Sequence, residues 1–476
     1  MFEQVASLKN MMSRIKAERS ENDSLSEQEL MELQSQRRDP KEKKLEQVRS
    51  EYMDFRSHPL AQKIDTFRTL SKTFGIENPF FRVHENVHGT RTTIAGRDCI
   101  NFSGYNYLGF NDHPVLRRSV ADAVLKYGTS VGASRLVAGE RPFHRQLENK
   151  LSALYEKEDA IAFVSGHATN VSVISVLFGA GDLIVYDGLS HNSIIEGVKL
   201  SGARFYPYPH NDPEALEKIL ENHRTEYQRT LIVTEGLFSM DGDVPDLDRL
   251  IEIKNKYGCI LMIDEAHALG VLGSHGRGLH EYFAEKSMVC QRNQSDCSEL
   301  NIAEKLSRYS GEVDLWMGTL SKTLAGCGGY IAADRQIIDI LKFNAPGFVY
   351  SVGLSAPMAV AASAALDLML EDNAPVMRLQ HNAGFFVSKL KSFGLNTGKS
   401  IGYAVIPVIV GSSHRAVNMS NALYERGINV QPIIHPAVEE QQARLRFFIT
   451  SEHTESELSE TADLLAEAAR KEGLIK

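Results

Sequence analysis

The sequence has few cysteines and no long apolar run, and each absence excludes a class of protein. Its five cysteines are an odd number, and no two of them form a Cys-x-x-Cys pair. This argues against a disulfide framework and against a zinc cluster, so we expect no metal site. The most apolar windows are too short to cross a bilayer, and charged residues occur from the third position onward. We therefore expect no signal peptide, no membrane span and a cytoplasmic location.

An excess of positive charge is also absent, because 61 acidic residues outnumber 52 lysines and arginines and the two signs are well mixed. This balance argues against binding to nucleic acid. The point matters because residues 264–267 spell Asp-Glu-Ala-His, the letters of a helicase motif. A helicase also needs an upstream phosphate loop with four residues between its glycines. The nearest match has three residues between Gly394 and Gly398 and lies downstream, so we interpret it as a turn before a strand.

The apolar residues that are present indicate an α/β fold. The chain is 476 residues long, with 43% hydrophobic and 24% charged residues, which is typical of a globular protein with more than one domain. From about residue 96 onward, short apolar runs alternate with amphipathic stretches, a pattern that predicts a mainly parallel sheet with crossover helices. Ligands of such sheets bind at the carboxyl ends of the strands. The runs are AIAFVSG, DLIVYD, TLIVTEG and CILMIDEA.

We divide the chain into an N-terminal helical extension (1–60), an N-terminal segment (61–115), a large domain (116–350) with an insertion (285–312), and a smaller α+β domain (351–476). In the extension, apolar residues recur at helical spacing, which predicts two amphipathic helices. Their apolar faces could be covered by the main body, by a dimer partner or by a carrier protein. The residues are Phe2, Val5, Leu8, Met12 and Ile15, then Leu45, Val48, Tyr52 and Phe55.

The ends of two predicted strands carry groups suited to one flat ligand. Asp264 ends an apolar run and His267 follows three residues later, so both side chains can face the same edge of the sheet. A carboxylate placed there keeps a pyridine nitrogen protonated, which makes the ring an electron sink. Lys322 follows another apolar run and precedes a small-residue loop, where a partly desolvated amine can form a Schiff base with an aldehyde. Thr319, close by, offers a hydroxyl to a phosphate.

Two further positions fit the same ligand. Gly166 and His167 lie at a predicted strand-to-helix junction, where free backbone amides can hold a phosphate. His191 follows another predicted strand and could stack on a pyridine face. Taken singly, each feature also has a structural explanation, such as a helix-capping Ser165 or a hydrogen-bonded histidine. Their combination and order predict the cofactor pyridoxal 5'-phosphate (PLP).

At this point the sequence resembles the α-oxoamine synthases, which are fold-type I PLP enzymes. The resemblance covers about residues 80–476, apart from the insertion, and GYNYLGF and GTSVGASRLVAGERPFHRQLE place it nearest the serine palmitoyltransferases and the carrier-protein-linked synthases. It implies a large domain with a mainly parallel seven-stranded sheet, a smaller α+β domain and a homodimer. The motifs, in family order, are NFSGYNYLGF, SGHATN, DGLSHNSIIEG, TEGLFSMDGDVPDL, MIDEAHALGVLG, GTLSKTLAGCGGY and RLRFFIT.

The resemblance also implies roles for individual residues. Lys322 corresponds to the Schiff-base lysine, Asp264 to the partner of the pyridine nitrogen and His267 to the donor to the phenolic oxygen. His191 corresponds to the residue that stacks on the ring. The remaining expected cofactor contacts are Gly166, His167, Ser239, Thr319 and, across the subunit interface, Ser351. Tyr105 and Arg446 are expected to bind substrate, with Arg446 preferred over its neighbour Arg444 as the partner of the amino acid's carboxylate.

The activity implied by the resemblance is a decarboxylative condensation of a small amino acid, namely serine, alanine or glycine, with an acyl thioester. The acyl group would be carried on coenzyme A or on an acyl-carrier protein, and the product would be an α-amino ketone. An aminotransferase is the alternative, because it would share Lys322 and Asp264. A non-catalytic assembly subunit is disfavoured, since such chains are expected to lose the lysine.

Overall fold

The computed structural model describes residues 39–75, 77–292 and 301–476. Residue contacts divide the chain into two compact units, 1–77 and 78–476, and each is considered by itself. The first predicted apolar stripe, from Phe2 to Ile15, lies outside the described residues. Within the described part, no helix combines the length and the hydropathy that a membrane crossing requires.

The described part of the first unit consists of two helices joined by a short turn. Asp39 caps the first helix by accepting a hydrogen bond from the Lys41 amide, and Pro40 occupies its first position, where a missing N–H costs nothing. The predicted helix through Leu45, Val48 and Tyr52 is confirmed as α3, but Phe55, predicted to continue it, lies in the turn η1 because the helix ends at Tyr52. The elements are α3 (Pro40–Tyr52), the 3₁₀ turn η1 (Phe55–Ser57) and α4 (Pro59–Phe74).

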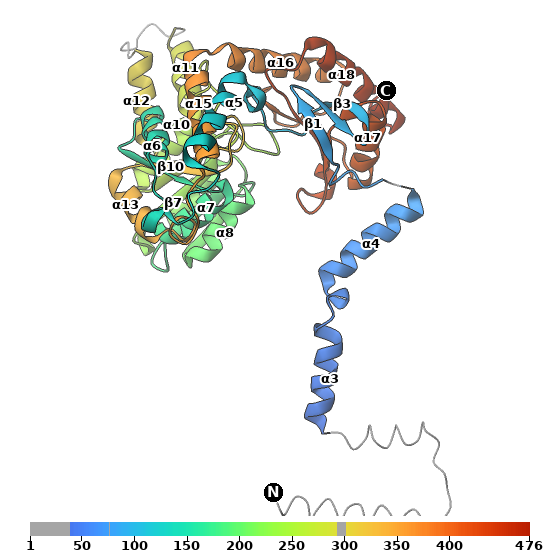
Figure 1. Ribbon diagram of the computed structural model, residues 1–476, viewed down its shortest axis with the longest axis horizontal. Coiled ribbons are helices and arrows are strands. Elements are labelled where there is room, and N and C mark those ends of the chain that lie inside the picture. Colours follow the sequence, from blue (N-terminus) through green and yellow to red (C-terminus); the bar gives the residue numbers. More distant parts are fainter. Residues whose placement is uncertain (1–38, 76, 293–300) are drawn as a thin grey trace, which may run out of the picture. The chain divides into compact units, whose positions relative to one another are not determined.

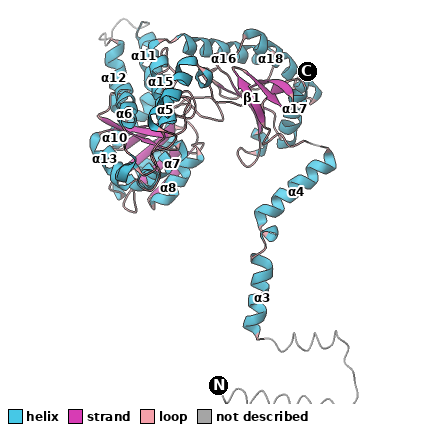
Figure 2. Ribbon diagram, in the orientation of Figure 1, coloured by secondary structure: helices cyan, strands magenta, loops and turns pink. Residues whose placement is uncertain are grey.

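The second unit is built around a seven-stranded sheet with the order β4-β10-β9-β8-β7-β5-β6. β10 runs antiparallel to both of its neighbours, and the other neighbouring pairs are parallel, as predicted for a mainly parallel sheet. Figure 2 shows these strands between layers of helices. The strands are β4 (Asp159–Phe163), β5 (Leu183–Asp187), β6 (Arg204–Tyr208), β7 (Thr230–Glu235), β8 (Ile260–Asp264), β9 (Leu315–Thr319) and β10 (Gly329–Ala333).

Alternating side chains of the large sheet form two hydrophobic cores, one on each face. In β4, Ala160 and Ala162 belong to one core, and Ile161 and Phe163 belong to the other. This alternation is the geometric consequence of an extended strand that is covered on both sides. Helices α7 (Gly166–Leu177), α8 (Asn192–Ser201), α13 (Arg335–Asn344) and α14 (Pro346–Val349) cover the second face (Figure 1).

The first face is covered by a larger group of helices, which also extends over the predicted insertion. There, α11 continues to Arg292, and residues 302–312 form α12. The helices of this group are α5 (Pro114–Tyr127), α6 (Pro142–Leu154), α9 (Pro213–His223), α10 (Leu247–Tyr257), α11 (Leu279–Arg292), α12 (Ile302–Glu312) and α15 (Ala356–Glu371). Short helical turns are η2 (Phe110–Asp112), η3 (Arg135–Gly139), η4 (Arg224–Glu226) and η5 (Glu440–Gln442).

The C-terminal part forms two small sheets packed with helices. In the sheet β1-β2-β3-β12, Ile428 pairs with Ile100, so this sheet joins the segment before the large sheet to the C-terminal part. The predicted turn at Gly394 and Gly398 lies between α16 and β11, and both glycines have positive φ angles. The elements are β1 (His84–His88), β2 (Arg91–Ile94), β3 (Arg97–Asn101), α16 (Ala374–Ser392), β11 (Val405–Ile409), α17 (Ser413–Glu425), β12 (Ile428–Asn429), β13 (Gln431–Ile433), β14 (Arg444–Phe448) and α18 (Glu455–Lys471).

Candidate active site

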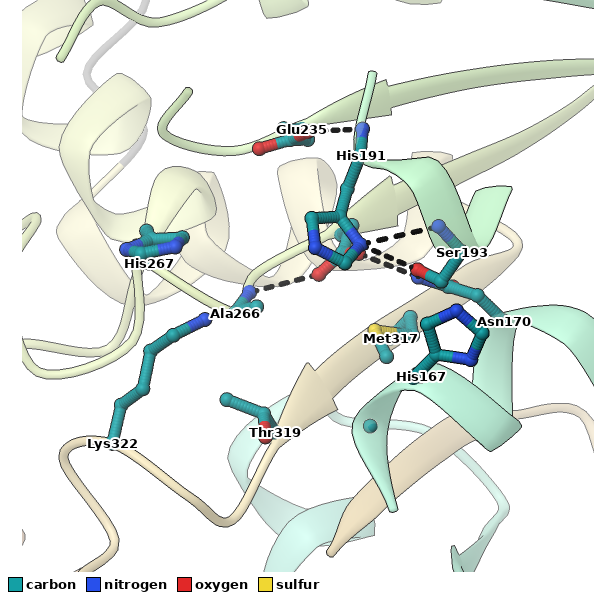
Figure 3. Close-up of a pocket in the computed structure, with 12 residues that line it drawn as sticks. His167, Asn170, His191, Ser193, Glu235, Ala266, His267, Met317, Thr319 and Lys322 are labelled. Atoms are coloured by element: carbon teal, nitrogen blue, oxygen red, sulfur yellow. Dashed lines mark hydrogen bonds between the residues drawn. The ribbon is translucent and has the colours of Figure 1, made fainter. Parts of the chain in front are cut away.

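A cavity with about 400 Å³ of empty space lies at the carboxyl edge of the large sheet. Parallel strands bring their final residues and the following loops to one edge, which is why distant motifs meet there. Figure 3 shows the side chains of Lys322, His191 and His167 directed into this cavity from different elements. The predicted residues that line it are Gly166, His167, His191, Asp264, His267, Thr319 and Lys322.

Asp264, the last residue of β8, is held in a fixed orientation. Its Oδ2 accepts a hydrogen bond of 2.8 Å from Asn170 Nδ2, and its Oδ1 accepts one of 2.9 Å from the Ala266 amide. The residue is only 3% exposed. A buried carboxylate that accepts hydrogen bonds only from neutral groups keeps its negative charge available to a cation in the cavity. The group suits a protonated ring nitrogen.

Asn170 connects this carboxylate to the residue predicted to stack on the ring. Besides Asp264, its Nδ2 donates to Ser193 Oγ at 2.9 Å. Ser193 Oγ lies 2.7 Å from Nδ1 of His191, and this contact orients the imidazole at the start of α8. The ring of His167 meets the ring of His191 edge to face, with centroids 6.4 Å apart. A continuous set of hydrogen bonds thus orients Asp264 and His191, the two side chains on which a flat cofactor would depend.

Lys322 lies in the loop between β9 and β10, with its side chain half-buried. Burial lowers the pKa of its amine to about 8, and the charges of Asp264 and Glu235 only partly oppose this effect. Its Nζ lies 5.6 Å from the centroid of the Tyr105 ring. Because only the neutral amine attacks an aldehyde, the lowered pKa suits Schiff-base formation near neutral pH.

His267 is fixed by a tyrosine from a distant part of the chain. Tyr107 is fully buried, and its hydroxyl lies 2.7 Å from His267 Nδ1. This contact leaves Nε2 as the ring nitrogen that can reach a ligand in the cavity. Burial holds the pKa of His267 well below its usual range, so the ring is neutral. The ring also stacks on Phe448, with an interplanar angle of 12°.

The opposite end of the cavity has the features of a phosphate site. Helix α7 begins at Gly166, and the helix dipole and the free amides of the first turn favour an anion there. A Cβ atom on Gly166 would lie 2.9 Å from Thr319 Oγ1, so only glycine fits against this hydroxyl. Thr319 Oγ1 itself donates to the Gly328 carbonyl at 2.9 Å and accepts from the Ser321 amide at 3.2 Å.

The two candidate arginines of β14 have different environments. Arg444 donates to the Met240 carbonyl and forms a 2.7 Å ion pair with Asp241. Arg446 donates through NH1 to the Ser239 carbonyl at 3.1 Å, and its buried Nε has no hydrogen-bond partner in the described part of the chain. Burial lowers the pKa of Arg446. Arg446 is therefore the guanidinium with free hydrogen-bonding capacity.

Four predicted residues do not line the cavity of the single chain, namely Arg446, Ser239, Tyr105 and Ser351. Ser239 lies beside it, with its amide 3.4 Å from Glu235 Oε2 and its carbonyl bound to Arg446. Tyr105 packs edge-on against Phe448 at 4.9 Å. Ser351 is half-buried in the segment after α14.

Four further residues build the site and were not predicted from the sequence, namely Asn170, Ser193, Glu235 and Tyr107. Glu235 is the last residue of β7 and lines the cavity. Its carboxyl group accepts a hydrogen bond of 2.6 Å from the His191 amide. Burial, with the nearby charge of Asp264, raises its pKa to about 8. An acidic residue at the end of an apolar run was a signal that could have identified Glu235.

A group of residues with metal-ligand spacing lies elsewhere in the described part of the chain, formed by His275, Glu281 and Glu285. Glu281 Oε2 accepts hydrogen bonds from the amides of His275 and Arg277, and Glu285 accepts one from the amide of Ser274. These carboxylates therefore brace the 274–277 turn.

Comparison with known proteins agrees with this geometry. Residues 97–465 match the family model for class I and II aminotransferases. The 8-amino-7-oxononanoate synthase of Geobacter sulfurreducens is 39% identical over 389 residues, which is 81% of this chain and 93% of that protein. The same enzyme of Thermoanaerobacter pseudethanolicus is 37% identical over 377 residues, covering 79% and 89% of the two chains. The solved structure of a serine palmitoyltransferase from S. paucimobilis with bound PLP has a TM-score of 0.79 and 26% identity, covering 87% of this chain and 98% of that one.

The side chains fit the cofactor in kind and in placement. An amine of lowered pKa, an oriented carboxylate, a helix N-terminus and a stacking imidazole all face one cavity. Groups of these kinds suit the aldehyde, the ring nitrogen, the phosphate and the ring of PLP. The chain is a fold-type I enzyme with PLP as its cofactor, and it belongs to the α-oxoamine synthase family.

Proposed function

We propose that the chain condenses a small amino acid with an acyl thioester, releasing carbon dioxide and free thiol and giving an α-amino ketone. The observation that carries this proposal is that Lys322 and Asp264 line one cavity, while the partly unpaired Arg446 lies close enough for its charge to act on Lys322. An acyltransferase of this kind agrees with the relatives named above. When bound, PLP supplies an electron sink for negative charge on the amino acid's α-carbon.

The residues of the chain divide the remaining work. Lys322 Nζ, with a pKa of about 8, is suited to take the α-proton as a general base. Asp264 presents its carboxylate in one fixed position because Asn170 and the Ala266 amide donate hydrogen bonds to its two oxygens. His267, neutral and held at Nδ1 by Tyr107, offers Nε2 as a hydrogen-bond partner inside the cavity.

The geometry around Arg446 supports a small amino acid. Its partly buried guanidinium has an Nε without a partner in the described part of the chain and can accept a carboxylate as a ligand, whereas Arg444 is already paired with Asp241. Tyr105 and Phe448 crowd the same region, since their rings lie 4.9 Å apart and Lys322 Nζ lies 5.6 Å from Tyr105. This crowding favours glycine, alanine or serine over amino acids with large side chains.

For the acyl donor we propose coenzyme A or an acyl-carrier protein. The resemblance of residues 128–148 to carrier-protein-linked synthases supports the second. The serine palmitoyltransferase relative carries in its name both an amino acid, serine, and a long acyl group. A thioester supplies the activated acyl carbon in either case, and its thiol is the leaving group.

We also infer that the active form is a homodimer. Segments 133–139 and 350–353 lie side by side, joined by the hydrogen bond from the Gly353 amide to the Ala133 carbonyl. Both expose large apolar side chains, with Val137 81% and Tyr350 86% exposed. Burial of such a surface against a second copy would place Ser351 in the interface. Light scattering should give twice the chain mass, and Tyr350→Glu should reduce it to one.

The function is tested by offering the purified protein serine, alanine, glycine and a bulky control, leucine, each with acyl-coenzyme A and with acyl-carrier protein. We expect free thiol and carbon dioxide in equal amounts with one of the small amino acids. Lys322→Ala should abolish both, together with the near-visible absorbance band that borohydride removes. Amino-group transfer to a keto acid without thiol release would instead identify an aminotransferase.

A further inference from the structure

A buried histidine bridges two carboxylates just outside the cavity. His210 follows β6, and its Nδ1 lies 3.0 Å from Asp187 Oδ1, while its Nε2 lies 2.9 Å from Asp243 Oδ2. The side chains of His210, Asp187 and Asp243 are only 11%, 0% and 8% exposed. A neutral imidazole has one N–H and can donate to one carboxylate, whereas the imidazolium donates to both. The geometry therefore fits the charged form.

The titratable groups around His210 come from three elements. Asp187 ends β5, Asp243 belongs to the loop after β7, and Tyr208 is at the end of β6, beside Asp187. The fourth neighbour is apolar, because the Phe238 ring meets the imidazole edge to face at 4.4 Å. Burial lowers the pKa of His210, but the two carboxylates outweigh this effect and raise the pKa to about 9.

Asp187 shapes the turn that leads to His191. Its Oδ1 also accepts the Leu189 amide at 2.8 Å, and its backbone carbonyl accepts the Ser190 amide at 2.9 Å. Oδ2 accepts the amide of Asn211, the residue after His210, at 2.9 Å. A shift of this carboxylate would therefore change the 188–190 turn and the position from which His191 enters the cavity.

Asp243 closes the loop that holds Arg446. Its backbone carbonyl accepts the Phe238 amide at 3.0 Å, and its Oδ2 accepts the side-chain amide of Asn211 at 3.0 Å. Within this 238–243 loop, the Ser239 carbonyl accepts the hydrogen bond from Arg446 NH1. The loop closure and the position of the guanidinium are thus linked.

We propose that His210 is a positioning residue of the reaction: its imidazolium fastens the turn that carries His191 to the loop that holds Arg446. This fixes the spacing between the group that stacks on the cofactor and the group that binds the amino acid's carboxylate. His210 itself contacts no substrate in this proposal. Its effect on catalysis rests on the proposed function, but its joining of the two loops is independent of that function.

Two variants separate the halves of the bridge. The side-chain amide of asparagine reaches roughly the place of imidazole Nδ1, and that of glutamine roughly the place of Nε2. His210→Asn should therefore keep the contact with Asp187 and release Asp243, and His210→Gln should do the reverse. His381→Gln is the matched control, because His381 is 65% exposed and pairs with Glu455 on the surface.

The first measurement is amide hydrogen exchange of the full-length protein. We expect faster exchange in residues 238–243 for His210→Asn and in residues 188–190 for His210→Gln, with neither change in the control. The second is steady-state kinetics per mole of borohydride-reducible cofactor. Loss of one charge-assisted hydrogen bond predicts a roughly tenfold rise in the amino acid's KM for His210→Asn, with kcat within about twofold. His210→Gln should instead lower kcat by about fivefold, at nearly unchanged KM.

Unchanged exchange in both loops would overturn the proposal. Equal changes of kcat and of KM in the two variants would also overturn it, because they would mark a general structural role. If the wild-type protein forms no α-amino ketone, the proposed function fails while the exchange pattern still tests the bridge. In that case the dissociation constant of serine, from the change in the cofactor absorbance band, replaces KM. A tenfold weaker constant for His210→Asn supports the bridge, and an unchanged constant contradicts it.

Discussion

Substitution of Asn170 by alanine should weaken cofactor binding, because the Asn170 side chain holds both Asp264 and Ser193 in place. Its Nδ2 donates to Asp264 Oδ2 at 2.8 Å and to Ser193 Oγ at 2.9 Å. A hydrogen bond to a charged acceptor contributes about 1.5–3 kcal/mol and one to a neutral acceptor about 0.5–1.5 kcal/mol. Water entering the space left by the amide would replace about half of this, so a net loss of about 1.6 kcal/mol, or about 15-fold in the dissociation constant, is expected.

The assay is titration of cofactor-free protein with PLP, followed by absorbance. Ser193→Ala is the matched variant, because it removes the neutral acceptor and leaves the contact with Asp264, and it should weaken binding by only about fivefold. Asn170→Asp should be worse than alanine, since it would place a second carboxylate beside Asp264. A wild-type dissociation constant for Asn170→Ala would refute the view that this amide orients the carboxylate.

Three further predictions concern separate parts of the site. Tyr107→Phe removes the hydroxyl that holds His267 Nδ1, so kcat should fall by about tenfold with an unchanged melting temperature, measured by steady-state kinetics and thermal unfolding. Because burial lowers the pKa of Lys322 to about 8, its neutral fraction grows as pH rises, and the stopped-flow rate of PLP attachment to the apoprotein should be half-maximal near pH 8 and level off above about pH 9. Gly166→Ala places a Cβ 2.9 Å from Thr319 Oγ1, so equilibrium titration should show weaker binding of both PLP and inorganic phosphate.

The sequence alone was sufficient to predict those site residues whose signal lies in the neighbouring sequence. Asp264 and Lys322 stand at the ends of apolar runs, and the parallel order of those strands places their side chains at one edge. Asn170 and Tyr107 carry no such signal, because their partners Asp264 and His267 lie 94 and 160 residues away in the chain. Such contacts depend on tertiary packing and not on any local pattern.

The same distinction applies to the fold. Alternating apolar runs predicted the mainly parallel sheet, since each run forms its own strand. The reversed direction of β10 and the pairing of Ile428 with Ile100 were not predicted, because they depend on which strands meet after long connections. The predicted division into an extension, a segment and two domains stays a prediction.

The fate of the amino acid's carboxyl group distinguishes decarboxylative condensation from amino-group transfer. The protein is supplied with carboxyl-labelled serine, alanine or glycine and an acyl thioester, and labelled carbon dioxide and free thiol are counted together. Decarboxylative condensation predicts one carbon dioxide per thiol with a small amino acid, and neither product with Lys322→Ala. Label that stays in a keto acid, with no thiol released, would contradict it.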